Sequence, residues 1–367
     1  MAKIKSVYSR EILDSRGNPT IETTIWSDSN HGSVASIPSG ASTGRMEALE
    51  LRDGDIHRFS GMGVLKAVAN VNQIISKYII GQDPTQQGVI DQILLNLDGT
   101  PNKSKLGANA ILSVSQAVCE LGAACSNMAT FEYLAQKYGF TKPAALNLPT
   151  PIFNLINGGK HGAGNLEFQE FHIIPSSRKP FSEGLTIGVE LYHALKQILI
   201  DKKAIHSIGD EGGFAPNLFS NTDAIELLVE TIEGSPYKHN EDVFIGLDVA
   251  ASSLFKNGKY KISDVKDTLS GKEMADFLID LNKKYNLLSI EDPLDQDAWD
   301  DWTYLNLELG KQVMIVGDDL LVTNPIRFKE AIAKNACNSI LVKPNQIGSI
   351  TETVAVIKMA KLNGFNT

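Results

Sequence analysis

The sequence has few cysteines and no long apolar run, and each scarcity excludes a class of protein. Its three cysteines, Cys119, Cys125 and Cys337, are too few for a disulfide framework and lack the spacing of a zinc site. Reduced core cysteines are typical of a cytoplasmic protein, which is the location we expect. The sequence contains no run of about 18 apolar residues, so it predicts no membrane-spanning helix. The N-terminus lacks the apolar region of a signal peptide.

Positive charge is also in deficit. The 367 residues include 34 Lys and Arg against 43 Asp and Glu, which gives a formal net charge of −9. An acidic chain repels a phosphate backbone, so nucleic acid is not an expected partner. Carboxylates gathered at one site would instead suit a divalent cation. The hydrophobic content of 43% is that of a globular protein, and the length favours two domains.

A Pro-containing stretch near residues 142–151 marks a predicted domain boundary. Before it, residues 21–26 are typical of a strand and residues 109–139 have an Ala-rich helical pattern, so we predict an α+β domain over residues 1–142. After it, apolar strands alternate with helices, and the strands are predicted at 244–247, 287–290, 313–316 and 339–342. Such alternation predicts a parallel sheet over residues 143–367, either a (β/α)8 barrel or an open doubly wound sheet.

Helix-start signals support this alternation. Capping boxes are predicted at Ser270 and Ser349, each with a Glu three residues later, and Pro325 is placed to begin a helix.

An ionisable residue follows each of these four strands. Asp248 ends the first, Glu291 the second, Asp318 with Asp319 the third, and Lys343 the fourth. In a barrel, the carboxyl ends of the strands meet at one face, where active sites are built. Clustered carboxylates would raise each other's pKa unless a cation joined them, and oxygen ligands without Cys or His favour Mg²⁺. The alternative is that each acid caps the helix after its strand.

Lys343 is the cation of this group. The ordinary pKa of a lysine is about 10.4, but burial beside a divalent cation disfavours the ammonium form. A neutral Lys343 would be a general base for a proton alpha to a carboxylate, since metal coordination of that carboxylate stabilises the carbanion formed. A salt bridge from Lys343 to Asp318 or Glu291, without chemistry, is the alternative.

Three segments upstream carry further candidates. Asp210 and Glu211 precede a Gly-Gly pair in S-I-G-D-E-G-G-F, where a carboxyl group is either a general acid toward a leaving hydroxyl or part of an ordinary acidic turn. His161, in N-G-G-K-H-G, is a ligand-binding group or a surface-loop histidine. Gln169 and Glu170 begin a strand and could face the same cavity. The loop P-S-G-A-S-T-G at 38–44 is no Walker A motif but could close over a site.

Taken together, these stretches resemble the enolase family. The matching segments, in family order, are S-R-E-I-L-D-S-R-G-N-P-T, P-S-G-A-S-T-G, N-G-G-K-H, F-Q-E-F, G-D-E-G-G-F-A-P-N, G-L-D-V-A-A-S, I-E-D-P, G-D-D-L and K-P-N-Q-I-G. The resemblance covers almost the whole chain. It implies an α/β protein with an N-terminal α+β domain followed by a TIM-like barrel whose second strand runs antiparallel.

The resemblance also implies an activity and two Mg²⁺ per active site. Asp248, Glu291 and Asp318 would hold the first Mg²⁺, and the loop at Ser42 would help to bind a second that enters with the substrate. The implied reaction is that of phosphopyruvate hydratase, the dehydration of 2-phosphoglycerate to phosphoenolpyruvate in glycolysis, which runs in reverse in gluconeogenesis.

Residue roles follow from the same resemblance. Lys343 would remove the C2 proton, and Glu211 would protonate the departing C3 hydroxyl. Glu170 would assist near that leaving group, and His161 and Gln169 would contact the substrate. Glu291, Asp318 and Lys343 are expected at the substrate as well.

The chain departs from the family pattern at its end. After Gly364 the family has another strand, a Ser-His-Arg-Ser-Gly-Glu stretch and a further substrate lysine, and about six of the eight barrel strands fit in 143–367. We therefore expect a C-terminally truncated chain with an incomplete barrel. The alternatives are another superfamily lyase or racemase, and a catalytically impaired remnant that acts as a binding protein. The family implies a homo-oligomer, a dimer or octamer, and by analogy a surface or secreted pool.

Overall fold

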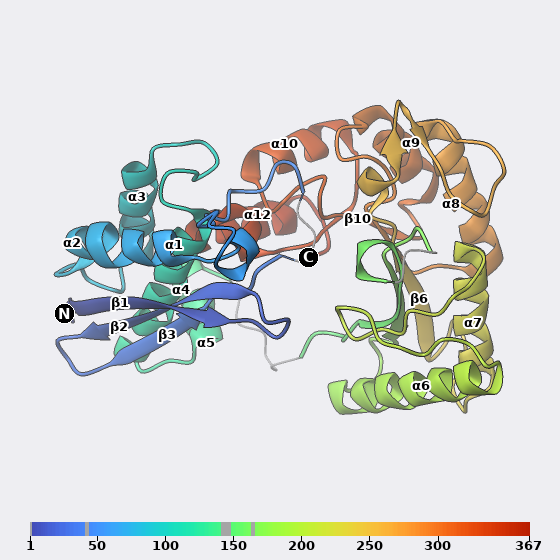
Figure 1. Cartoon of the computed structure of the whole chain (residues 1–367), viewed down its shortest axis with the longest axis horizontal. Helices are drawn as coiled ribbons and strands as arrows, with labels where there is room; N and C mark the ends of the chain where they lie inside the picture. The colour runs from blue at the N-terminus through green and yellow to red at the C-terminus, as the bar shows by residue number, and fades with distance from the viewer. Residues whose placement is uncertain (1, 41–43, 141–147, 163–165) are drawn as a thin grey trace. The chain divides into compact units, whose positions relative to one another are not determined.

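The computed structural model describes residues 2–40, 44–140, 148–162 and 166–367 (Figure 1). The chain forms two compact units that interleave in sequence. The first consists of Met1–Ala145, Val322–Pro325 and Val342–Met359. The second consists of Leu146–Leu321, Ile326–Leu341 and Ala360–Thr367.

The first unit contains a three-stranded antiparallel sheet with β2 at its centre. Its strands are β1 (Ile4–Leu13), β2 (Pro19–Ser27) and β3 (Gly32–Ser36). Ile21, Thr23 and Ile25 of β2 are fully buried, as expected of alternate residues on the covered face of a sheet. The strand predicted at 21–26 is therefore confirmed.

Helix α4 (Ala108–Cys125) packs on this sheet, and further helices surround it. These are α1 (Leu65–Ala69) and α2 (Ser76–Ile79), joined by a π-helical turn at Asn70–Ile75, then α3 (Gln87–Asp98) and α5 (Thr130–Tyr138). The single helical stretch predicted at 109–139 is wrong in one respect, because it breaks between α4 and α5. Asn127 adopts φ 53°, and the Met128 N–H turns back to the Ala123 carbonyl, which ends α4.

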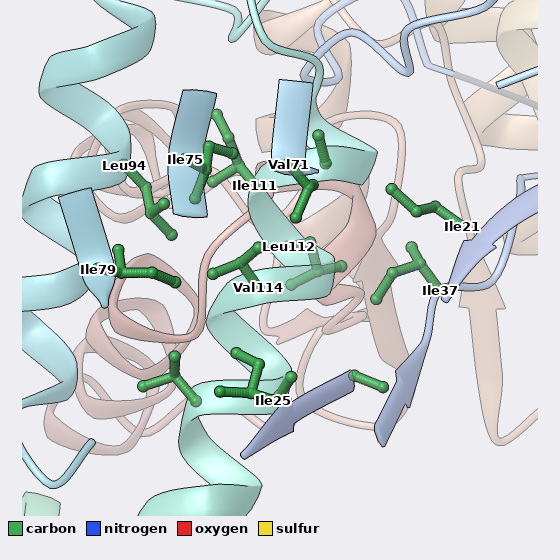
Figure 2. Close-up of a cluster of buried hydrophobic side chains, with 14 of the residues drawn as sticks. Ile21, Ile25, Ile37, Val71, Ile75, Ile79, Leu94, Ile111, Leu112 and Val114 are labelled. Carbon is green, nitrogen blue, oxygen red and sulfur yellow. The ribbon is translucent and has the colours of Figure 1, made fainter. Parts of the chain in front are cut away.

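The core of this unit lies between α4 and the surrounding elements (Figure 2). Side chains from β2, from the π-helical turn and from α4 meet there, among them Ile25, Ile75 and Ile111. Helix α4 is long and apolar enough to cross a membrane by composition, with a mean hydropathy of 1.2 over 18 residues, but 78% of that window is buried. Its apolar surface is therefore used as core.

The second unit is built on a six-stranded mixed sheet in the order β11-β10-β9-β6-β5-β4. The strands are β4 (Phe153–Asn157), β5 (Glu170–Pro175), β6 (Val243–Asp248), β9 (Ser289–Glu291), β10 (Met314–Gly317) and β11 (Ser339–Ile340). Strand β5 runs antiparallel to both β4 and β6, as the resemblance implies, and the pairs from β6 to β11 are parallel. Among the described residues the sheet is open, with β4 and β11 at its edges.

Helices connect these strands as the alternation predicted. They are α6 (Phe181–Asp201), α7 (Asn221–Glu233), α8 (Gly271–Tyr285), α9 (Trp299–Leu309) and α10 (Pro325–Lys334). Helices α6 and α7 pack on each other and on β5 (Figure 1). The capping box at Ser270 is confirmed, because Ser270 Oγ accepts the Glu273 N–H and Glu273 Oε2 accepts the Ser270 N–H. A short hairpin, β7 (Phe255–Lys256) and β8 (Lys259–Tyr260), follows β6.

Two helices follow β11, the first of them a single turn. Helix α11 (Pro344–Ile347) lies in the first unit, and α12 (Ile350–Leu362) begins there. The strand predicted at 339–342 is shorter than expected, since β11 ends at Ile340. The Leu341 N–H still donates to the Gly317 carbonyl at 3.2 Å, but the next residue belongs to the first unit.

Candidate active site

The carboxyl ends of β6, β9 and β10 lie side by side. Asp248 pairs with Glu291, and Glu291 pairs with Val316, two residues before Asp318. Neighbouring strands are about 4.8 Å apart, and residues paired across a sheet point to the same face. The register therefore sets Asp248, Glu291 and Asp318 along one edge of the sheet.

A tighter group of oxygens lies at the same edge. Asp292, Asp318 and Asp319 each offer one carboxylate oxygen, and these atoms all lie within 4.8 Å of one another. Asp292 also holds the loop after β10, since its two oxygens accept the backbone N–H groups of Asp318 at 3.0 Å and Asp319 at 2.7 Å. The sequence analysis named Asp319 among the strand-end acids but not among the metal ligands, and it did not single out Asp292, the second acid of I-E-D-P.

Negative charge accumulates here. Burial, followed by the charges of Asp319, Asp318 and Asp248, raises the pKa of Asp292 well above its usual range. A divalent cation among these oxygens would offset the repulsion, and an all-oxygen donor set suits Mg²⁺ or Ca²⁺. The residues present therefore fit a hard divalent metal. The ligand set Asp248, Glu291 and Asp318 stays a prediction.

Gln169 lies beside Asp248 and is hydrogen-bonded to it. Its side-chain amide donates to Asp248 Oδ2 at 3.1 Å, and its backbone N–H donates to the Asp248 carbonyl at 2.9 Å. The Ala250 N–H donates to Asp248 Oδ1 at 3.0 Å. These bonds fix the orientation of the buried Asp248 carboxylate, as partners behind a metal ligand commonly do.

A second cluster joins His161, Glu170, His172 and Glu211. His161 Nδ1 lies 3.3 Å from Glu170 Oε1 and 3.7 Å from Glu211 Oε2, and His172 Nε2 lies 2.8 Å from Glu170 Oε2. The structure thus brings together three residues that the sequence singled out separately. His161 is 5% exposed, so the surface-loop alternative is excluded. His172, two residues beyond Glu170 on β5, was not anticipated.

Two loops bring these side chains together. The Asp210 N–H donates to the His161 carbonyl at 3.3 Å, which links the G-D-E-G-G turn to the N-G-G-K-H loop. A Cβ at Gly209 would lie 2.2 Å from that same carbonyl, so only glycine permits this approach. At Gly212 φ is 85°, which closes the turn. The glycines that flank Asp210 and Glu211 are required by the geometry of the turn.

Neighbouring groups shift the pKa values within the cluster. Burial alone would raise the pKa of Glu170, but its hydrogen bond with His172 and its contacts with His161 and Glu211 outweigh burial and hold that pKa well below its usual range. The contact with Glu170, opposed by burial, raises the pKa of His161. Glu211 lies on the exposed side of this cluster, since 40% of its side chain is exposed against 15% for Glu170, so Glu211 is the carboxyl group that a reactant can reach.

Two further predicted site residues, Lys343 and Ser42, belong to other parts of the chain. Lys343 is half-buried and belongs to the first unit, where its backbone N–H donates to Thr323 Oγ1 at 2.8 Å. Its place beside the carboxylates stays a prediction. Ser42 lies outside the described residues.

The second unit thus combines a mixed sheet, clustered carboxylates that could hold a hard cation, and a neighbouring His–Glu cluster suited to proton transfer. Residues 4–134 match the enolase N-terminal domain, and residues 145–367 match the enolase C-terminal TIM barrel domain. The chain therefore belongs to the enolase family. Members of this family are metal-dependent lyases that act on small molecules, and the acidic groups of this chain can bind such a metal.

Proposed function

We propose that this protein is a phosphopyruvate hydratase, which removes water from 2-phosphoglycerate to give phosphoenolpyruvate. The observation that carries the proposal is the cluster of His161, Glu170 and Glu211 in a chain of the enolase family, with His161 Nδ1 at 3.3 Å from Glu170 and 3.7 Å from Glu211. Dehydration needs an acid that gives a proton to a hydroxyl, and we assign this role to Glu211, whose side chain is 40% exposed.

Lys343 is the proposed base. Its ε-amine takes the C2 proton, and the electron pair left behind forms the new C2–C3 double bond as the C3–O bond breaks. Glu211 gives its proton to the departing hydroxyl, which leaves as water. In this proposal Glu170, kept ionised by His161 and His172, disfavours a second negative charge beside it and so favours the acid form of Glu211 between turnovers. One proton enters Lys343 and one leaves Glu211, so the reaction balances with loss of one water.

Asp248, Glu291 and Asp318 are the proposed ligands of one Mg²⁺, with Gln169 orienting Asp248. When bound, Mg²⁺ would withdraw charge from the substrate carboxylate and so make the C2 proton more acidic. Asp292 holds the backbone of Asp318 and Asp319 in place. We further propose a second Mg²⁺ bound with substrate near Ser42, substrate contacts from His161 and Gln169, a cytoplasmic glycolytic role and a homo-oligomeric assembly.

The direct test is whether the purified chain forms phosphoenolpyruvate from 2-phosphoglycerate when Mg²⁺ is present. The ultraviolet absorbance of phosphoenolpyruvate measures its formation. We expect turnover that EDTA abolishes and excess Mg²⁺ restores. The control is Glu211→Gln, which leaves the cation-binding edge intact but has no proton to donate. Absence of turnover at all Mg²⁺ concentrations by a folded chain would overturn the proposal and favour a binding role.

A further inference from the structure

The segment that carries Lys343 packs within the first unit, although most residues of that unit lie far from this segment in the sequence. Val342–Met359 belongs to that unit, and its polar contacts there join residues up to 260 positions apart. The segment contains Lys343, α11, Gly348 and the first turns of α12. The residues that bind it are candidates for positioning the proposed base.

Asp91 on α3 caps the N-terminus of α12. It is 1% exposed, and its Oδ2 accepts the Thr351 N–H at 2.9 Å and the Thr351 hydroxyl at 2.5 Å. Its Oδ1 accepts the Ser115 hydroxyl at 2.6 Å, and Ser115 Oγ in turn accepts the Ile350 N–H at 3.0 Å. The first N–H groups of a helix lack partners within it, and a carboxylate there also meets the positive end of the helix dipole.

Lys103 is the second anchor. It is 3% exposed, and its ammonium group contacts the Glu352 carboxylate at 3.2 Å. Its aliphatic stem passes Gly348, where a Cβ would lie 2.9 Å from Lys103 Cδ. Gly348 also has φ 92°, a conformation that favours glycine. The turn between α11 and α12 is therefore fitted against Lys103.

The contacts continue to Lys343 itself. Buried Thr323 accepts the Lys343 N–H and donates its hydroxyl to Gln346 Oε1 at 3.0 Å. The Gln346 carbonyl accepts the Ala48 N–H at 2.8 Å. Hydrogen bonds thus run from Lys343 through α11 to Ala48 of the first unit, and α11 itself packs on α4.

We propose that Asp91 and Lys103 are positioning residues for Lys343. They fix α12 and the Gly348 turn, and these fix the backbone from which the Lys343 side chain projects. The catalytic meaning of this inference rests on the proposed function, but the anchoring itself does not. Burial raises the pKa of Asp91 despite its hydrogen bonds, so the carboxylate is retained at an energetic cost that Asn would avoid.

Asp91→Asn tests this in the full chain, because Asn cannot accept every bond that Asp91 accepts, from Thr351, Ser115 and Gln87. Asp83→Asn is the matched control: Asp83 accepts the N–H and hydroxyl of Thr85, as Asp91 accepts those of Thr351, but these bonds lie away from the Lys343 segment. Amide hydrogen exchange of residues 343–352 should speed up about tenfold or more in Asp91→Asn and little in Asp83→Asn. Lys103→Met against exposed Lys105→Met forms a second pair. Thr351→Val is a milder variant should Asp91→Asn not fold.

Competitive labelling of Lys343 with acetic anhydride separates positioning from plain stability. In Asp91→Asn we expect its reactivity to change at least about threefold, while the other lysines keep theirs. If the wild type turns over 2-phosphoglycerate, kcat should fall about tenfold with little change in KM. If it does not, the proposed function fails while labelling and exchange still decide the anchoring. Unchanged exchange and labelling, or equal effects in Asp83→Asn, would overturn the inference.

Discussion

Glu170 shows how neighbours set the behaviour of one carboxyl group. Burial would favour its protonated form, yet His161, His172 and Glu211 all stabilise the carboxylate. The consequence for stability depends on pH in opposite ways for the two partners. Because the pKa of Glu170 is lowered in the folded protein, Glu170 stabilises the fold at pH values above the pKa it has in the unfolded chain, and this stabilisation is lost as pH falls. Because the pKa of His161 is raised, His161 stabilises the fold at pH values below the pKa it has in the unfolded chain, about 6.5, and this stabilisation is lost as pH rises.

The first prediction follows from His161. His161→Gln should lower the free energy of unfolding more at about pH 6 than at about pH 9, because only the charged imidazole gains from Glu170. Urea unfolding at the two values measures the difference. His206→Gln, at an exposed position, is the control and should lower stability equally at both. A larger loss for His161→Gln at the higher pH would contradict the pairing.

Helix α8 carries two polar interactions of different worth, a capping box at its start and an exposed ion pair near its end. Its capping box satisfies N–H groups that the helix leaves unpaired, whereas its Lys283–Asp280 ion pair lies in solvent. Ser270→Ala should therefore cost about 1 kcal/mol. Lys283→Ala should cost clearly less, because solvent screens an exposed ion pair. Chemical denaturation of the two variants compares them on one helix, and an equal or reversed ranking would show that the cap contributes little.

Much at this scale could be predicted because it depends on local signals. Apolar runs gave β6, β9 and β10, and capping residues gave the starts of α8 and α10. The break at Asn127 was missed, since Ala-rich periodicity continues across it. The membership of residues 342–359 in the first unit could not be predicted, because it depends on bonds such as Asp91–Thr351 across 260 residues.

The candidate site, too, could be predicted only in part. Strand-end acids were visible because each follows an apolar run. Their register, which brings Asp248 beside Glu291, needed the sheet itself. The grouping of His161, Glu170 and Glu211 rests on three separate segments, so no spacing in the sequence could indicate their distances.

At the scale of the whole molecule, the acidic edge should make stability depend on cations. Millimolar Mg²⁺ should raise the melting temperature by a few degrees, because an ion that binds only the folded state stabilises it by mass action. Asp318→Asn should abolish most of that shift. Asp267→Asn removes one charge at an exposed position and should retain it. An equal loss in both variants would mean that Mg²⁺ acts only by screening the net charge of −9.

The central claim is that Lys343 takes the C2 proton and Glu211 releases the hydroxyl. The most direct test is exchange of the C2 hydrogen of 2-phosphoglycerate with deuterated solvent. NMR of the substrate pool follows the exchange in the wild type and in two variants. The account predicts exchange without phosphoenolpyruvate for Glu211→Gln, and neither exchange nor product for Lys343→Ala. Exchange that persists in Lys343→Ala would contradict it.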